Sequence, residues 1–152
     1  MAVGDWDWRP MTRDDVEWLV GLKARAMQAE LEQIGRWDPS RARQRLLDEL
    51  VVGATWVVRI DELAVGSIAL VPGAPTSWLQ HFYVEPGLQG NGLGSAVLGR
   101  LLGTAPESTI RLLAVKTSRA VRLYERHGFV RERDHENGVD VVMVRDMPRR
   151  GV

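Results

Sequence analysis

A glycine-rich hexapeptide, Gln89-Gly90-Asn91-Gly92-Leu93-Gly94, has the residue types of an anion-binding segment. It follows an apolar, extended stretch at 78–84 and opens a segment, 93–102, in which apolar residues recur every three to four positions. Glycine has no side chain to cover the backbone N–H groups, and the start of a helix carries a partial positive charge. The sequence therefore predicts a backbone cradle for a phosphate or diphosphate group.

Two familiar phosphate-binding loops differ from this segment. A Walker loop contains Gly-Lys-Ser or Gly-Lys-Thr, and neither tripeptide occurs in the chain. A dinucleotide-binding loop usually follows the first strand of its fold and has an acidic residue about twenty positions later. Here the segment follows the fourth expected strand, and the stretch 110–114 contains no acid. The pattern therefore disfavours both of these sites.

Composition excludes several classes of function. The chain of 152 residues has the length of one domain, expected to span 1–152 with a core at 5–147. Twenty basic residues balance twenty acidic ones, so charge gives no indication of nucleic acid or membrane binding. The absence of cysteine excludes disulfides, thiolate metal sites and a cysteine nucleophile. His81, His127 and His135 are too far apart in sequence for a local metal motif, so no metal is expected.

The start of the chain and its apolar runs indicate a cytoplasmic protein. Residues 1–10 are acidic and aromatic, unlike a signal peptide. No apolar run approaches the roughly 20 residues that span a bilayer.

Hydrophobic periodicity and turn residues predict the order β-α-α-β-β-β-α-β-α-β-β. The expected strands are 6–9, 54–60, 63–71, 78–84, 110–115, 129–133 and 139–146, and the expected helices are 16–34, 38–51, 93–102 and 117–127. The expected buried faces are Val16, Leu19, Val20, Met27, Leu31 and Ile34 in the first helix, and Leu46, Leu47, Leu50 and Val51 in the second. The tail 148–150 is expected to fray.

A second motif, Ala120-Val121-Arg122-Leu123-Tyr124-Glu125-Arg126-His127-Gly128-Phe129, stands about thirty residues after the glycine segment. The pair resembles the two signatures of the GNAT acetyltransferase superfamily, in the family's order and with a strand between them. The paired helices before the sheet and the hairpin after it agree, and the segment 34–38 resembles that of a subgroup of unassigned substrate. The resemblance implies a single α/β (α+β) domain with a mixed central sheet of about six to seven strands and helices on both faces.

The resemblance also implies a cofactor site for acetyl-CoA, which is the co-substrate of this family. Backbone N–H groups of the glycine segment would hold the diphosphate, and the backbone of the fourth strand would pair with the pantetheine arm. Where relatives often have asparagine before the last helix, this chain has Thr117, or Ser118 as an alternative cap. The implied cofactor-binding residues are Phe82, Tyr83, Val84, Gln89, Gly90, Asn91, Gly92, Leu93, Gly94, Ser95, Thr117, Ala120 and Tyr124.

Acetyl transfer to an amine needs two proton transfers. Tyr124 matches the family tyrosine that protonates the departing thiolate, and its alternative is packing on the inner face of the helix. Many relatives use an acid or a histidine on the fourth strand as the base, and here Gln80 stands where an acid would help. His81 has a suitable unperturbed pKa. Strand alternation would place it with Leu79 and Tyr83, and its alternative is a structural role with water relaying the proton.

The acceptor pocket of this family is walled by the first two helices and their connection. This implies Glu30, Trp37 and Gln80 as substrate-binding residues, with acidic groups such as Glu30 and Asp38 attracting a cationic amine. Trp37 would stack on that amine. The alternative is that Asp38 only caps a helix and Trp37 only fills a gap.

The resemblance thus predicts an N-acetyltransferase that moves an acetyl group directly from acetyl-CoA to a primary amine of a small molecule or protein. The alternative is a non-catalytic acyl-CoA sensor of the same fold, because the fourth strand has no acid between Ala74 and Val84. The expected partners are acetyl-CoA and the amine acceptor. Edge strands and six tryptophans also offer surfaces for a homodimer.

Overall fold

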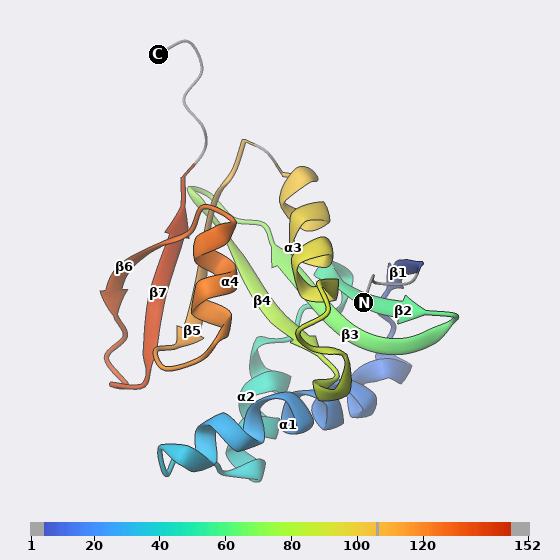
Figure 1. Ribbon diagram of the computed structural model, residues 1–152, viewed down its shortest axis with the longest axis horizontal. Helices are drawn as coiled ribbons and strands as arrows, with labels where there is room; N and C mark the ends of the chain where they lie inside the picture. Colours follow the sequence, from blue (N-terminus) through green and yellow to red (C-terminus); the bar gives the residue numbers. More distant parts are fainter. Residues whose placement is uncertain (1–4, 106, 147–152) are drawn as a thin grey trace. The chain divides into compact units, whose positions relative to one another are not determined.

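The computed structural model describes residues 5–105 and 107–146 (Figure 1). Seven strands and four α-helices follow one another in the described residues, in the predicted order. The strands are β1 Trp6–Pro10, β2 Thr55–Ile60, β3 Leu63–Val71, β4 Thr76–Val84, β5 Thr109–Val115, β6 Val130–Asp134 and β7 Asp140–Arg145. The helices are α1 Val16–Gln33, α2 Pro39–Glu49, α3 Leu93–Gly103 and α4 Ala120–Arg126. The predicted frayed tail and the end of the predicted core, at 147, lie outside the described residues.

The strands form one mixed sheet in the order β1-β2-β3-β4-β5-β7-β6. Neighbours β1–β2, β2–β3, β5–β7 and β6–β7 pair antiparallel, and β4–β5 pair parallel. The prediction of an α/β domain with a mixed sheet of six to seven strands is therefore confirmed. The residue contacts divide the chain into two compact units, 1–69 with 81–94 and 70–80 with 95–152, and each is described by itself.

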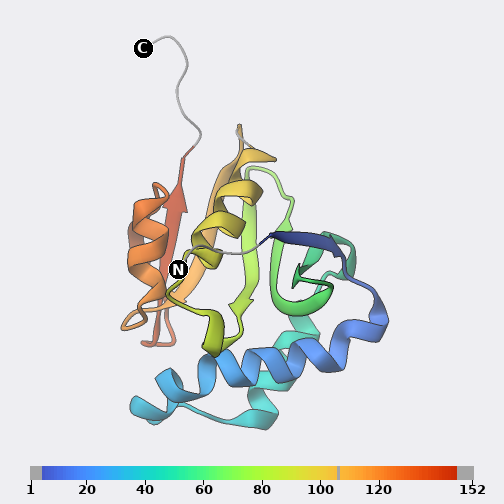
Figure 2. The ribbon, with the colours of Figure 1, turned by 45° about the vertical axis from the view of Figure 1, so that its right-hand side comes forward.

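In the first unit, α1 and α2 lie side by side (Figure 2) and contribute to one hydrophobic core. Leu19 and Leu22 of α1, Leu46 of α2 and Val57 of β2 are fully buried in this cluster. Burying a leucine side chain stabilises the fold by about 2 kcal/mol, so these side chains hold both helices against the strands. On β1 and β2, Trp8 stacks on Trp56 with ring centroids 4.8 Å apart.

Local side-chain contacts define the starts of both helices. Thr12 and Asp15 form the capping box before α1, and Arg9 donates two hydrogen bonds to the Asp15 carboxylate, at 2.8 and 2.9 Å. This guanidinium lowers the pKa of Asp15 to about 2. Asp38 caps α2 by accepting a hydrogen bond from the N–H of Arg41 at 3.1 Å, and Pro39 occupies the first helical turn.

The predicted buried faces of these helices are partly wrong. Leu46 is buried, but Leu47 is exposed because one residue turns the side chain about 100° around the helix. Val51 is exposed because α2 has already ended at Glu49, and Ile34 is exposed because it follows the last turn of α1. The prediction omitted Leu22, which is fully buried.

In the second unit, β5 pairs with β7 over six residues and α4 lies against β5, as Figures 1 and 2 show. Leu112 and Met143 are buried on these strands, and Val121 and Tyr124 are buried on the helix. Gly128 ends α4 at φ +93°, a backbone conformation that favours glycine. The predicted β6–β7 hairpin is confirmed.

Gly66 of β3 is a close-approach position. A Cβ atom added there would lie 2.7 Å from the carbonyl oxygen of Tyr83, a backbone atom that cannot move aside. We expect Gly66→Ala to lower the free energy of unfolding by about 2 kcal/mol, in the range of overpacked cores. Urea denaturation measures this. Gly53→Ala is the matched control, because no atom lies within 4 Å of its added Cβ. Equal stabilities of the two variants would contradict the close approach.

Candidate functional site

The glycine segment lies between the 3₁₀ turn η3, Pro86–Leu88, and α3. Gly90 and Gly92 have φ angles of +83° and +90°, in the left-handed region where glycine has no steric penalty. Both are exposed, and an added Cβ at Gly90 would meet no atom within 4 Å. Asn91 accepts a hydrogen bond from the N–H of Leu93 at 3.2 Å, which shapes the entry into α3. The first turn of a helix leaves N–H groups without intrahelical partners, so this segment has the donors that a diphosphate needs.

Two side chains of the first unit hold the turn before the glycine segment. Gln89 donates from its side-chain amide to the carbonyl oxygen of Val84 at 3.0 Å. Arg25 of α1 binds the Glu85 carboxylate through contacts of 2.6 to 3.2 Å. This contact raises the pKa of Arg25 and occupies the Glu85 carboxylate, so Glu85 is a structural residue and a poor base. The glycine segment thus starts from a backbone position fixed to α1.

His81 interrupts β4. Its φ angle is +50°, which is unusual for a residue with a side chain. Burial alternates at Ser77, Leu79 and His81, but the next buried residue is Val84. The alternation of burial therefore ends at His81, although the rings of His81 and Tyr83 still lie 6.4 Å apart, as the predicted alternation places them. The hydroxyl of Ser67 donates to the His81 carbonyl oxygen at 2.6 Å, which helps to hold the irregular backbone.

The His81 imidazole is only 6% exposed. Burial lowers its pKa, and the Lys23 ammonium lowers it further. The Glu49 carboxylate and a hydrogen bond to the Glu49 backbone act in the opposite direction but are outweighed. Among the described residues, Nε2 of His81 has no hydrogen-bond partner.

In the second unit, Tyr124 of α4 is 7% exposed. Its ring packs edge-on against Phe129, with centroids 5.8 Å apart and planes at 66°. This contact fixes the orientation of the phenol ring. The two alternatives for Tyr124 are therefore compatible: its ring is part of the packed face, and its hydroxyl remains a candidate proton donor.

The predicted start of the last helix is wrong. Instead of beginning at Thr117, α4 begins at Ala120, and Thr117 is an exposed turn residue. Ser118 causes this difference, because its hydroxyl accepts a hydrogen bond from the N–H of Ala120 at 3.1 Å. A serine bonded two residues ahead favours a turn over a continued helix. The reach of Thr117 toward a cofactor remains a prediction.

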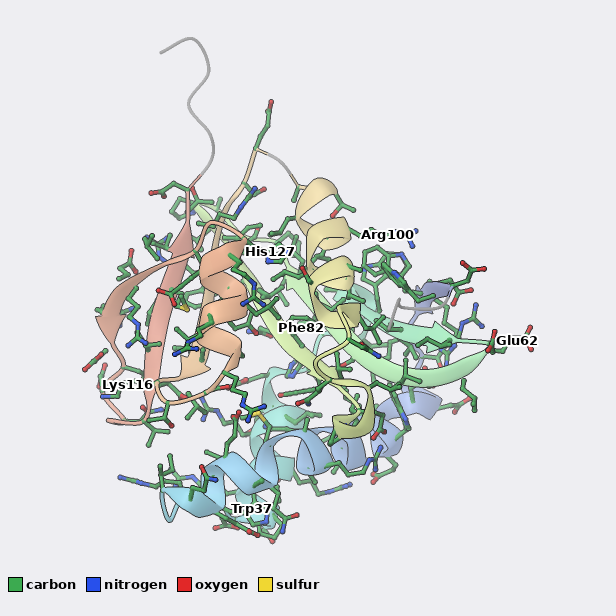
Figure 3. All side chains as sticks on the ribbon, in the orientation of Figure 1. Trp37, Glu62, Phe82, Arg100, Lys116 and His127 are labelled. Carbon is green, nitrogen blue, oxygen red and sulfur yellow. The ribbon has the colours of Figure 1, made fainter. Side chains whose placement is uncertain are left out.

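A cavity of about 290 Å³ lies between α1 and α2. Trp37, labelled in Figure 3, lines it from the connection between the helices. Its other lining residues are Val20, Gly21, Lys23, Ala24, Pro39, Ser40, Ala42 and Arg43. The cavity wall includes Trp37 but not Glu30. Its ionisable groups are basic, so this wall does not supply the acidic attraction that the sequence suggested for a cationic amine.

Gln80 of β4 has a buried side-chain oxygen without a hydrogen-bond partner in the described part of the chain. A buried amide oxygen usually has a donor, so this atom is suited to an N–H group from outside the protein. The ladder between β4 and β5 pairs only Thr76–Trp78 with Thr109–Arg111. Gln80 therefore lies beyond the part of β4 that pairs with β5.

In 5–105 and 107–146, no group of three or more His, Asp or Glu side chains is placed to hold a metal ion. None of the helices in these ranges has the length and apolar character that crossing a membrane requires.

Comparison with protein families identifies the class. The model described as an acetyltransferase (GNAT) domain matches residues 52–131, more than half of the chain. This range contains the glycine segment, His81 and Tyr124. The chain therefore belongs to the GNAT acetyltransferase family. Comparison with curated protein sequences finds no match.

Solved structures share the fold at low sequence identity. The PaiA N-acetyltransferase of Thermoplasma acidophilum, solved with coenzyme A, superposes with a TM-score of 0.75 at 18% identity, covering 93% of this chain and 99% of its own. An acetyltransferase of Thermus thermophilus gives a TM-score of 0.73 at 19% identity, covering 95% and 99%. The ribosomal-protein-S18-alanine N-acetyltransferase of Escherichia coli gives 0.68 at 15%, covering 97% and 99%.

Some residues of the candidate site carry no signal in the sequence. Arg25 contacts a carboxylate sixty positions away, and Ser67 contacts a carbonyl fourteen positions away. The effect of Glu49 and Lys23 on His81 likewise depends on the packing of helices against β4. A local signal that the structure explains is the pair of tightly spaced glycines, Gly90 and Gly92, which lie in left-handed conformations.

The lowered pKa of His81 predicts a specific loss of stability in acid. The unfolded chain binds a proton near pH 6.5, whereas the folded ring resists it, so folding becomes less favourable as pH falls below about 6.5. His81→Asn removes this pH-dependent contribution to stability, and asparagine tolerates the left-handed backbone. We expect its unfolding free energy to fall less between about pH 7 and pH 5 than that of the parent protein.

Urea denaturation across this pH range measures the difference. The control is His135→Asn, because an asparagine oxygen can still accept the hydrogen bond that Nδ1 of His135 accepts from the N–H of Asn137. Parallel pH profiles for the parent and His81→Asn would show that the folded ring protonates as readily as the unfolded one.

Proposed function

We propose that this chain is an N-acetyltransferase that transfers an acetyl group from acetyl-CoA to a primary amine of a small molecule or protein, directly within a ternary complex. The observation that carries the proposal is the left-handed backbone of Gly90 and Gly92 at the entry to α3. A Cβ at Gly90 would extend into open space, so the backbone is accessible to a ligand as large as a diphosphate. The family membership supports the identity of that ligand.

Different segments of the chain would bind different parts of acetyl-CoA. The segment from Gln89 to Ser95 would hold the diphosphate, and the backbone of Phe82, Tyr83 and Val84 would pair with the pantetheine arm. In support, β4 continues for six residues after its last described pair with β5, at Trp78. Acetyl-CoA supplies an activated thioester carbonyl. No metal is needed for this chemistry.

Two side chains of the protein would move the protons. His81 would accept a proton from the amine, because its Nε2 has no hydrogen-bond partner among the described residues and its lowered pKa keeps the ring neutral at physiological pH. Tyr124 would donate a proton to the leaving thiolate, since a phenol held by Phe129 presents its hydroxyl in one direction. The side-chain oxygen of Gln80 would accept an N–H of the amine and orient it.

The cavity between α1 and α2 is our candidate for the body of the acceptor. Its apolar wall and the indole of Trp37 suit an aliphatic or aromatic group. Lys23 lines this cavity and also acts on His81 through its charge, so the cavity and the proposed base are neighbours within the first unit.

An acyl-CoA sensor without activity is the second candidate, favoured by the burial of His81 at 6% exposure. Incubation of the protein with acetyl-CoA and a panel of amines separates the two. Release of free CoA that depends on an added amine establishes the transferase. Binding of acetyl-CoA without such release establishes the sensor, and an absence of binding contradicts both.

Replacement of Gly92 tests the diphosphate cradle. At φ +90°, valine is strained and its side chain would cover the backbone N–H groups. We expect Gly92→Val to weaken acetyl-CoA binding at least roughly tenfold, since strain of this kind costs about 1–3 kcal/mol. Isothermal titration calorimetry measures it. Gly87→Val, in the preceding turn with no atom within 4 Å, is the matched control and keeps the affinity of the parent.

Replacement of Tyr124 tests the proton donor. Tyr124→Phe keeps the ring contact with Phe129 and removes only the hydroxyl. We expect kcat to fall roughly 100-fold, as for the loss of a general acid, while the dissociation constant of acetyl-CoA stays unchanged. Steady-state assays and calorimetry measure the two quantities. An unchanged kcat would remove Tyr124 from the mechanism.

A further inference from the structure

His127 links two helices of the second unit through both nitrogens of its ring. Nε2 lies 3.3 Å from the hydroxyl oxygen of Ser95, in the first turn of α3. Nδ1 lies 3.0 Å from the carbonyl oxygen of Leu123, in α4. Figure 3 shows the His127 side chain at the side of α4 that faces α3. The proposed chemistry does not use this ring.

The Leu123 contact decides which atoms donate. A carbonyl oxygen only accepts, so Nδ1 of His127 carries the hydrogen. In the neutral ring, Nε2 then has a lone pair and accepts the hydrogen bond from the Ser95 hydroxyl. The two contacts therefore form a directed chain of hydrogen bonds from α3 through the imidazole to the backbone of α4.

The backbone of His127 is also held. Its N–H donates to the carbonyl oxygen of Tyr124 at 3.0 Å, and its own carbonyl accepts from Nε of Arg145 at 3.0 Å. The Arg145 side chain passes 3.5 to 3.8 Å from the position of a Cβ at Gly128. The imidazole is therefore anchored to α4 and β7, and it can transmit this position to α3.

A glycine of α3 makes room for the ring. A Cβ added at Gly99 would lie 3.9 Å from Nε2 of His127. Residues 95 and 99 are one turn apart on the same side of α3, so one face of this helix meets the imidazole over about one turn. This packing is independent of the hydrogen bond and shows the same approach of the ring to α3.

We infer that His127 is a positioning residue for the proposed transfer reaction, an inference that rests on the proposed function. Ser95 directly follows the glycine segment, and Tyr124 precedes His127 by three residues. The Ser95–His127 hydrogen bond fixes the first turn of α3, which contributes to diphosphate binding, relative to the helix that carries the proton donor. The distance between these two groups sets where the thioester sulfur lies when the thiolate departs.

Two replacements of His127 place a side-chain amide at different positions of the imidazole ring, one near Nε2 and the other near Nδ1. In His127→Gln the side-chain amide reaches the place of Nε2 and can still accept from Ser95. In His127→Asn the shorter amide reaches only the place of Nδ1, and asparagine is a favourable residue at the end of a helix, so the fold is kept. Ser95→Ala removes the same bond from the other side.

We expect His127→Asn and Ser95→Ala to lower kcat roughly tenfold each, because small displacements of reacting groups have effects of this size or larger. His127→Gln restores most of kcat. The double variant Ser95→Ala with His127→Asn is no slower than either single variant, because both remove one interaction. In His127→Asn the affinity for acetyl-CoA and the melting temperature stay close to those of the parent, which a purely structural role would not predict.

Nitrogen-15 NMR of the histidine rings tests the geometry without acetyl-CoA. The expected spectrum has the hydrogen on Nδ1 of His127, and the Nε2 resonance shifts in Ser95→Ala. Hydrogen on Nε2 instead, or a full kcat in both His127→Asn and Ser95→Ala, would overturn the inference. A parent protein that shows no amine-dependent release of CoA would contradict the proposed function itself, so the two failures are distinguishable.

Discussion

The backbone at Gly90 and Gly92 is the constraint on which the candidate site depends. Two left-handed residues within three positions turn the chain sharply at the entry to α3. Most side chains would make this turn costly, by about 1–2 kcal/mol for each residue. Both glycines are exposed, and an added Cβ at Gly90 would meet no atom within 4 Å, so a ligand can approach the backbone there. The surrounding contacts, from Arg25 to Glu85 and from Gln89 to Val84, hold the strand end from which this turn starts.

His81 presents a second unfavourable feature in the same unit. It combines a left-handed backbone, a buried ring and a ring nitrogen without a hydrogen-bond partner among the described residues. Each of these features opposes folding, and the bonds from Ser67 and to the Glu49 backbone offset only part of the cost. Such concentrations of strain and unmet polar groups are typical of functional positions. These features are the basis of our proposal that His81 is the base.

Local patterns were sufficient for the order of elements, because strand and helix periods, caps and turn glycines are encoded in neighbouring residues. Asp38 and Pro39 at α2 and the hairpin between β6 and β7 are examples. The predicted helix boundary was wrong at α4, where the Ser118 hydroxyl accepts a hydrogen bond from the N–H of Ala120 and favours a turn. The prediction of buried residues was wrong where burial depends on which face of a helix packs against its neighbours, as for Leu47 and Leu22.

In the candidate site, too, some features can be predicted from the sequence and others depend on the folded structure. The glycine segment is recognisable from its residue types and spacing, and Tyr124 from the resemblance of its motif to that of the family. The lowered pKa of His81, in contrast, depends on burial and on Lys23 and Glu49, which distant segments bring to it. Regular alternation along β4 gave Tyr83 as a neighbour of His81, and their ring centroids lie 6.4 Å apart, but it gave no sign of the left-handed backbone at His81.

The distribution of the tryptophans gives the chain an optical asymmetry. Trp6, Trp8, Trp18, Trp37 and Trp56 belong to the first unit, and Trp78 belongs to the second. The stacked pair Trp8 and Trp56 couples two indole chromophores at 4.8 Å. Intrinsic fluorescence and near-ultraviolet circular dichroism therefore report mainly on the unit that contains the glycine segment, and loosening of β1 would appear in these signals as the loss of exciton coupling.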